Sequence, residues 1–268
     1  MNVRPFLAPV LLGFLLAVVA PVIALFGLAG FDWNLIDTPK WVGLDNFTNL
    51  NLGTSLITTA WIALLVVVIT VGFGGLLGYL GFKSIYLLPW FTAPIAIGVI
   101  WKWILAPTGG LLSTSLGFRV DLLSNVFWAP ITVAAVISWC GIGYTALIFS
   151  SALNSVQANT VDAAALDGAG RSTTLWRIQL PQIRRLVYFI IVTTTIQALT
   201  TYDLIYILTG GGPSLTTDVV SIHVVDQALK TFQVGSASAT SIAFLIFEVL
   251  ILLVEYFVYR LVTRRFND

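Results

Sequence analysis

Carboxylates and tyrosines inside otherwise apolar stretches are the side chains most able to do chemistry in this sequence. Asp203, Glu248 and Glu255 each lie in a long apolar run. A charged residue in such a run is costly in a bilayer and usually faces the interior of a helix bundle. Tyr202 and Tyr206 are about one helical turn apart and offer rings and hydroxyl groups beside Asp203. This combination suits hydrogen bonding to a sugar.

The two glutamates have different expected roles. Glu248 and Glu255 are spaced so that they share one helix face, which we expect to look inward. Glu248 could bind substrate hydroxyl groups or hold a helix–helix hydrogen bond, and we favour the second. Glu255 should pair with a basic residue such as Arg260 or one on another helix. The candidates for the substrate pathway are therefore Tyr202, Asp203, Tyr206 and Glu248.

Nucleophile and metal chemistry have little to build on. The sequence contains one histidine, His223, and one cysteine, Cys140. An intramembrane enzyme would need a nucleophile with its base or a cluster of metal ligands. We therefore expect no catalytic residue and no metal site, and interpret His223 as a loop or gate residue.

The composition is that of a membrane protein. Hydrophobic residues make up 58% of the 268 residues and charged residues only 9%, and the mean hydropathy is +0.96. Ordinary soluble domains carry about 25% charged residues. A net charge of +1 gives no electrostatic case for binding nucleic acid. We predict one polytopic transmembrane permease domain over residues 1–268, with membrane lipid around it.

The elements that must position these residues are six apolar segments. A spanning helix needs about 20 mainly apolar residues. The fold class is therefore all-α, with six transmembrane helices, and the first segment is too long for the core of a signal peptide. Pro89, Pro94 and Lys102 interrupt the third segment, which could mark a hinge or simple bundle packing, and we favour packing. The predicted spans are 6–26, 55–80, 85–105, 130–150, 186–208 and 238–262.

The basic residues set the orientation, because lysine and arginine accumulate in cytoplasmic loops. With the N-terminus inside, nine of the 13 basic residues face the cytoplasm. Lys40, Lys102, Arg119 and Lys230 then face out, and Lys102, between two tryptophans, is interpreted as an interface anchor. Both termini are expected to be cytoplasmic, in a multi-pass protein of a bacterial or archaeal plasma membrane.

A polar segment of about 152–185, between the fourth and fifth spans, stands out on the cytoplasmic side. Its alanine-rich part, 156–166, predicts a helix that stops at Gly168, since glycine commonly ends helices in the left-handed conformation. Ser172 could cap a second short helix that ends near Pro181. From the residues alone, docking into a partner and resting on the lipid surface are equally good interpretations.

This segment resembles the coupling loop of ATP-binding-cassette importer permeases, which reads Glu-Ala-Ala, three residues, Gly, and later Leu-Pro. The opening acid here is aspartate, one methylene shorter than glutamate. The resemblance implies contact with an ATPase through Asp162, Ala163, Ala164, Leu166, Asp167, Gly168 and Ala169.

Further motifs are similar to those of carbohydrate-uptake permeases of the maltose and glycerol-3-phosphate type. They are Trp41-Val42-Gly43-Leu44-Asp45-Asn46-Phe47, Leu88-Pro89-Trp90, Ile100-Trp101-Lys102-Trp103 and Leu208-Thr209-Gly210-Gly211-Gly212-Pro213. The resemblance places an outer gate loop at Gly210, Gly211, Gly212 and Pro213.

The resemblance also implies the partners. These are a second permease subunit in a heterodimer, two cytoplasmic ATPase subunits and an extracytoplasmic solute-binding protein. The chain has no Gly-x-x-x-x-Gly-Lys-[Ser/Thr] phosphate loop, so ATP and Mg should bind to the partner ATPase, and no cofactor to this chain.

The expected substrate is a mono-, di- or oligosaccharide. A phosphorylated substrate would need arginine or lysine nearby, and few basic residues lie in the spans. Import of glycerol-3-phosphate or a glycerophosphodiester is the alternative. A gradient-driven secondary transporter is the rival class, but such proteins typically show paired repeats, and no repeat is evident.

Overall fold

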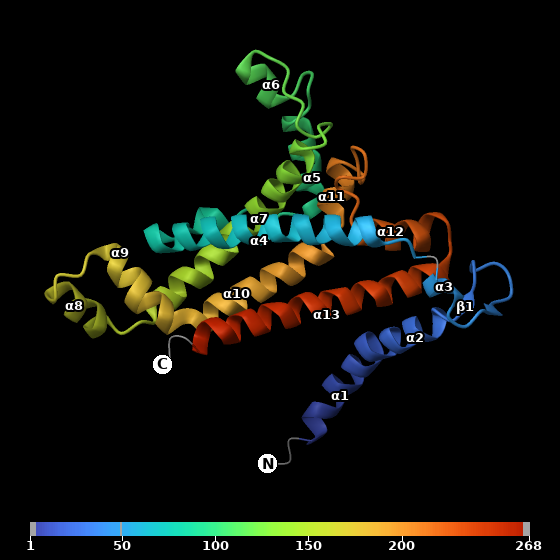
Figure 1. The fold of residues 1–268 in the computed structure, drawn as a ribbon, viewed down its shortest axis with the longest axis horizontal. Coiled ribbons are helices and arrows are strands. Elements are labelled where there is room, and N and C mark those ends of the chain that lie inside the picture. Colours follow the sequence, from blue (N-terminus) through green and yellow to red (C-terminus); the bar gives the residue numbers. More distant parts are fainter. Residues whose placement is uncertain (1–3, 49, 265–268) are drawn as a thin grey trace. The chain divides into compact units, whose positions relative to one another are not determined.

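The computed structural model describes residues 4–48 and 50–264, which are mostly helical (Figure 1). The described residues divide into two compact units, one with residues up to Leu56 and Val220–Val249, the other with Ile57–Val219 and residues from Leu250 onward. The elements of the first unit begin with α1 (Arg4–Phe14), the π-helical turn η1 (Leu15–Val19), α2 (Ala20–Leu28), β1 (Phe31–Asp32), β2 (Lys40–Trp41) and α3 (Asp45–Thr48). The remaining elements are α4 (Gly53–Gly81), the 3-10 turn η2 (Ser84–Leu87), α5 (Pro94–Ile104), α6 (Leu111–Leu116), α7 (Trp128–Asn154), α8 (Ala158–Leu166), α9 (Arg171–Thr174), the π turn η3 (Leu175–Gln179), α10 (Leu180–Thr200), α11 (Asp203–Leu208), α12 (Val220–Val225), the π turn η4 (Asp226–Lys230) and α13 (Val234–Arg264).

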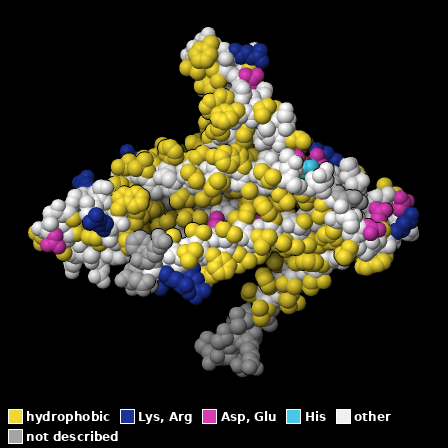
Figure 2. All heavy atoms as spheres, in the orientation of Figure 1, with side chains coloured by type: hydrophobic (Ala, Val, Ile, Leu, Met, Phe, Trp, Pro, Cys, Tyr) yellow, Lys and Arg dark blue, Asp and Glu magenta, His cyan; other side chains and the backbone are white. Residues whose placement is uncertain are grey.

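Within the described residues, five helical segments are long and apolar enough to cross a membrane: Pro9–Leu28, Gly53–Gly81, Trp128–Asn154, Arg171–Thr200 and Val234–Arg264. Each contains most of one predicted span. Hydrophobic side chains cover the visible face of the long helices (Figure 2).

Two of the predicted spans are broken. The prediction of one helix over 85–105 is wrong, because η2 gives way to a turn and α5 begins only at Pro94. Proline lacks an N–H group, so Pro89 and Pro94 cannot sustain a continuous helical ladder. The prediction of one helix over 186–208 is also wrong, since α10 ends at Thr200 and Thr201 is extended (φ −65°, ψ 121°). Asp203 therefore begins a separate short helix.

Two other prolines are absorbed without breaking a helix. The amide of Ala20 bonds to the carbonyl of Leu15 just before Pro21, and the amide of Leu180 bonds to Leu175 just before Pro181. Each bond is a π-type turn, a common way to bend a helix around proline. The second helix of the polar segment thus continues into α10 instead of ending near Pro181. Its N-cap is Gly170, not Ser172, because α9 already starts at Arg171.

In the second unit, small residues allow α4 to approach α7 closely. A Cβ added at Gly78 would lie 2.8 Å from the Ala146 carbonyl oxygen, and one at Gly74 only 2.5 Å from the side chain of Thr145. The helix α10 also packs on α7, through a buried cluster that includes Phe149, Ile183 and Ile190. Close glycine packing is typical of membrane helices.

The first unit has its own small core. Ala29, Ala239 and Ile242 are buried together, with Leu25 and Phe47 packed against them. The strands β1 and β2 pair antiparallel, with Phe31 opposite Trp41. The Asn46 amide donates to the carbonyl oxygens of Ala29 (2.8 Å) and Phe31 (3.0 Å), so this motif residue fixes the end of α2 to the strand.

Candidate functional site

A cavity of ≈ 420 Å³ lies within the second unit, among α4, the segment between η2 and α5, α7, α10 and the start of α11. It forms where two helical segments break. On one wall are Pro89 and Pro94, and on another are Thr200 and Thr201, at the end of α10. Non-helical backbone at membrane depth is tolerated where it lines a cavity. The breaks in the two predicted spans thus form part of the cavity wall.

The end of α10 is held by its own threonines. The Thr200 hydroxyl donates to the Ile196 carbonyl at 2.8 Å, and the Thr201 hydroxyl donates to Gln197 at 2.7 Å. These bonds satisfy carbonyl groups that the helix end leaves unpaired.

Polar groups of the cavity wall are hydroxyls, amides and one carboxylate. Thr70 is only 2% exposed and its hydroxyl oxygen has no hydrogen-bond partner within the described chain. Thr194, Gln197 and Asp203 add further donors and acceptors. None of the described residues that line this cavity is lysine or arginine. Such a wall can exchange hydrogen bonds with a neutral polyol but offers no counter-charge to a phosphate.

An aromatic platform belongs to the same wall. Trp90 lines the cavity and its ring stacks on Tyr144, with centroids 4.4 Å apart and an interplanar angle of 7°. Stacking fixes the orientation of the indole, and its apolar area can pack against the carbon face of a ring.

Three of the four sequence-predicted pathway residues lie together in the second unit, and Glu248 belongs to the first unit. Tyr202 and Asp203 line the cavity, and the Tyr206 ring stacks on Tyr202 with centroids 5.2 Å apart. Asp203 is the first residue of α11, where a carboxylate is favoured by the helix dipole. Glu248 lies on α13, and its Oε1 atom is buried without a hydrogen-bond partner in the described residues.

Among the described residues, Glu255 has no basic partner of the kind that the sequence suggested. Its Oε1 atom accepts a hydrogen bond from the Thr195 hydroxyl at 2.6 Å. Thr195 is 3% exposed, so a short neutral donor on α10 reaches the carboxylate where a long arginine side chain is not required.

The glycine-rich loop after α11 is closed by buried hydroxyl groups. Gly210 and Gly211 have φ values of +60° and +93°, which favour glycine. The Thr217 hydroxyl lies 2.7 Å from that of Thr209 and donates to the Gly212 carbonyl at 2.6 Å. Thr217 is fully buried. Sequence reasoning found the glycines but missed Thr217, because a threonine in a loop carries no spacing signal of its own.

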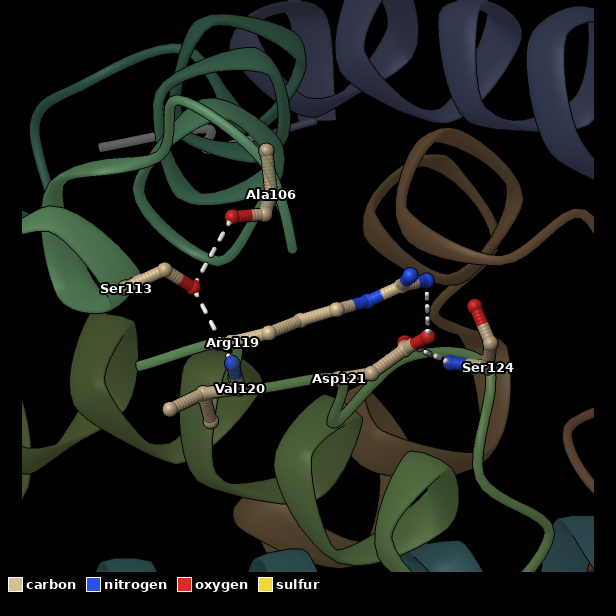
Figure 3. A network of polar contacts seen from close by, with 6 residues as sticks. All are labelled: Ala106, Ser113, Arg119, Val120, Asp121 and Ser124. Atoms are coloured by element: carbon tan, nitrogen blue, oxygen red, sulfur yellow. Dashed lines mark hydrogen bonds and ion pairs between the residues drawn. The ribbon is translucent and has the colours of Figure 1, made fainter. Parts of the chain in front are cut away.

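A polar pocket of ≈ 410 Å³ adjoins this loop, with Lys102, Asp121 and Pro213 in its wall. Lys102 donates to the Ile207 carbonyl at 2.8 Å and so ties α5 to the end of α11. Figure 3 shows the neighbouring network, in which Arg119 pairs with Asp121 at 3.4 Å. Hydrogen bonding from Ser124 and the Arg119 charge hold the pKa of Asp121 below its usual value of 3.8.

The alanine-rich helix α8 and the turn at Gly168 form a small knob, which we call the α8 knob. The Ala169 amide bonds to the Ala164 carbonyl (2.9 Å) and the Gly168 amide bonds to Ala165 (3.1 Å), the pattern of a Schellman cap. Gly168 has a φ of +80°, as predicted for a helix-ending glycine. Ala164 is buried, whereas Leu166 is 89% exposed. The knob is internally fixed and presents an unpaired apolar side chain.

Comparison with known proteins identifies the family of this chain. The model of the family described as "binding-protein-dependent transport system inner membrane component" matches residues 5–268. This chain belongs to that family. It is a permease subunit of the ATP-binding-cassette class, as the motifs predicted.

Two relatives of this permease illustrate the match. The probable ABC transporter permease protein YesP of Bacillus subtilis (strain 168) is 28% identical over 94% of this chain and 88% of its own length. The sn-glycerol-3-phosphate transport system permease protein UgpA of Agrobacterium fabrum (strain C58) is 29% identical over 69% of this chain and 63% of its own length.

The fold of the permease is also known. A chain in the crystal structure of a bacterial ABC transporter involved in the import of the acidic polysaccharide alginate superposes with a TM-score of 0.82 at 22% identity, covering 97% of this chain and 95% of that one. The inner-membrane family and the apolar helices place the permease in the membrane.

Proposed function

We propose that this permease forms half of the pathway of an ATP-driven importer for a neutral carbohydrate. One observation carries the substrate class. The cavity wall offers the buried Thr70 hydroxyl, the Gln197 amide and the Asp203 carboxylate beside the Trp90 ring, with no basic side chain among the described lining residues. Sugars need such hydrogen-bond partners and an aromatic face.

The proposed topology has six crossings in a single domain, with both termini in the cytoplasm. Five crossings are the long apolar helices. The sixth is formed by η2, the turn at Pro89 and α5, whose interruption supplies the cavity with irregular backbone. The distribution of arginine supports this orientation.

The α8 knob is proposed to dock on one of two cytoplasmic ATPase subunits, which bind ATP and Mg. Asp162, Ala163 and Asp167 are exposed on it together with Leu166, and α9 continues through η3 into α10 without a helix break. Motion of the knob would therefore reach Thr200 at the cavity through one rigid helix. A second permease subunit and an extracytoplasmic solute-binding protein complete the assembly.

The outer gate is proposed to be the loop Gly210–Pro213, which follows α11, the short helix that begins at the cavity residue Asp203. Tyr206 supports Tyr202 by stacking and is a positioning residue. Glu248 stays a pathway candidate because its buried oxygen lacks a partner in the described chain.

The test is to reconstitute the complete complex with its binding protein and to measure which solute stimulates ATP hydrolysis. Neutral sugars should stimulate, whereas glycerol-3-phosphate and glycerophosphodiesters should not. Thr70→Val, which removes the hydroxyl but keeps the shape, should raise the sugar concentration for half-maximal stimulation, and Thr70→Ser should restore it.

Two results would contradict the proposal. Stimulation by glycerol-3-phosphate alone would favour the substrate named for the UgpA relative. Uptake that proceeds without any ATPase subunit would favour a gradient-driven carrier.

A further inference from the structure

A second cavity, of ≈ 480 Å³, forms a groove between α10 and the C-terminal half of α13. On α13 its wall contains Val254, Val258 and Val262, which recur at every fourth residue and are 62%, 53% and 50% exposed. On α10 it contains Val187 and Ile191. The groove is therefore an apolar trough that follows two membrane helices.

The two ends of this groove differ in charge. Arg184 and Trp176 lie at one end, where α10 begins. Glu255 lines the groove farther along, bonded to Thr195. At 1.5 Å per residue, Arg184 and Thr195 are about 16 Å apart along α10.

The end near Arg184 is basic on both helices. Arg177 and Arg185 are close to Arg184 in sequence. Arg260 and Arg264 lie on the last turns of α13. The described residues 171–190 and 256–264 contain no aspartate or glutamate. Arg184 is half-buried, whereas Arg185 is exposed, so Arg184 lies along the groove and Arg185 points away from its wall.

We propose that this groove binds one anionic glycerophospholipid. The phosphate would meet the guanidinium of Arg184, and an acyl chain would lie along the valine face of α13. Arginine pairs with phosphate through charge-assisted hydrogen bonds, and anionic headgroups are attracted to basic clusters at the membrane surface. The Trp176 ring and the stacked Tyr188 and Tyr259 rings (centroids 4.2 Å apart) suit headgroup depth.

The position of Glu255 agrees with this occupant. One oxygen of its carboxylate, Oε1, accepts from Thr195, and Oε2 is buried without a partner in the described residues. The carboxylate lies roughly three helical turns along α10 from Arg184, so it is not beside the phosphate position. The groove therefore accepts an amphiphile in one orientation, with its anionic end at α9 and its chain toward the centre of α10.

The experiment is native mass spectrometry of the intact transporter complex, purified and then incubated with palmitoyl-oleoyl phosphatidylglycerol or phosphatidylcholine. Phosphatidylglycerol should be retained through detergent washing and phosphatidylcholine should not. Arg184→Gln should weaken retention about tenfold, the typical worth of one charge-assisted bond. Arg185→Gln is the matched control and should leave retention unchanged.

A second pair of variants tests the apolar part. Val258→Trp fills the groove and should abolish retention without altering charge. Leu253→Trp adds the same ring to an exposed position of α13 outside the groove wall and should not. Assembly of each variant is checked by the subunit mass of the complex.

Three outcomes would overturn the proposal. Equal losses in Arg184→Gln and Arg185→Gln would show diffuse attraction instead of a site. Equal retention of phosphatidylglycerol and phosphatidylcholine would show that the groove does not select for a negative charge. Efficient cross-linking of Val258→Cys to the second permease subunit, in a Cys140→Ala background, would show that protein covers the groove. Because no substrate or ATP is used, failure here leaves the transport proposal untouched.

Discussion

Two short helices in the second unit, α8 and α11, both end at a glycine with a positive φ, but the residues around the two glycines differ in burial. At α8, Gly168 has a φ of +80° and the adjoining Leu166 is 89% exposed. At α11, Gly210 has a φ of +60° and the loop that follows folds over the fully buried Thr217.

The difference fits the docking role proposed for the α8 knob and a self-contained closure at the glycine loop. The α8 knob satisfies its own backbone through the Ala169 and Gly168 amides, and its Leu166 side chain is exposed. The glycine loop uses side-chain hydroxyls to satisfy itself, through Thr209 and Thr217. Substitutions near Gly168 should therefore affect coupling to the ATPase, and substitutions near Gly210 should affect the stability of the permease.

The largest effect is expected for Gly168→Pro. Proline is restricted to φ near −65° and lacks the amide that bonds to Ala165, so the cap of α8 cannot form. ATP-dependent uptake should be lost while the subunit still inserts, as measured by transport in vesicles and by the amount of assembled permease. Gly170→Ala is the control, because Gly170 has a negative φ and open space around it, and uptake should persist. Normal uptake by Gly168→Pro would refute the coupling role.

Thr217→Val should lower the stability of the permease, because Thr217 closes the glycine-rich loop after α11. The substitution removes the donor to the buried Gly212 carbonyl and one of the two contacts of the Thr209 hydroxyl, which still donates to Ile205, at a cost of about 1–3 kcal/mol for buried polar groups. Thermal unfolding of the purified complex in detergent measures this loss. Thr217→Ser keeps the hydroxyl and should recover most of the stability. An unchanged melting temperature for the valine variant would show that these hydroxyls do not stabilise the loop.

Leu166→Ser should weaken ATPase binding without changing the stability of the permease. Leu166 is 89% exposed, so its loss should not affect folding. Burying a leucine side chain in an interface is worth about 1.5–3 kcal/mol, which is roughly tenfold or more in affinity. Copurification of the ATPase at a series of concentrations measures it. Leu215→Ser, an exposed leucine of the outer loop, is the matched control. Equal weakening by both variants would contradict the distinction between the two ends.

The smallest effect is expected at Asp121, in the pocket beside the outer loop. Its pKa lies below 3.8 in the folded protein, so its bonds with Ser124 and Arg119 contribute stability above pH 3.8 that is lost as the pH falls through the lower folded value. Because the pair is largely exposed, that contribution is small, and Asp121→Asn should lower the melting temperature only slightly near neutral pH. A large drop in melting temperature at neutral pH would mean that the Arg119–Asp121–Ser124 network also stabilises the glycine-rich loop.

Local patterns predicted much of the fold. Apolar length located each long helix, and the helix 156–166 with its stop at Gly168 was predicted to within two residues at its start, because alanine and glycine act locally. Of the candidate pathway residues, Tyr202 and Asp203 do line a cavity. Tyr206 was predicted as a pathway residue, but it is not among the lining residues of that cavity and stacks on Tyr202 instead.

Other features depend on contacts between distant segments. Hydropathy could not show that α10 ends at Thr200, or that Pro94 starts α5, since each stretch is mainly apolar over the length of a span. The Thr195 donor to Glu255 lies on a different helix, 60 residues away in sequence. The buried hydroxyl of Thr70 is unremarkable in sequence, because its significance comes from the cavity beside it.

The sequence by itself determined that this chain is a membrane permease with a fixed, glycine-capped α8 knob, because apolar length, the coupling-loop motif and glycine conformation are properties of neighbouring residues. Only the tertiary structure decided where the helices break, which hydroxyls face the cavity and how Thr217 closes the outer loop. Those features arise because a polar group inside an apolar protein must find its partner in space, and the partner belongs to another segment of the chain.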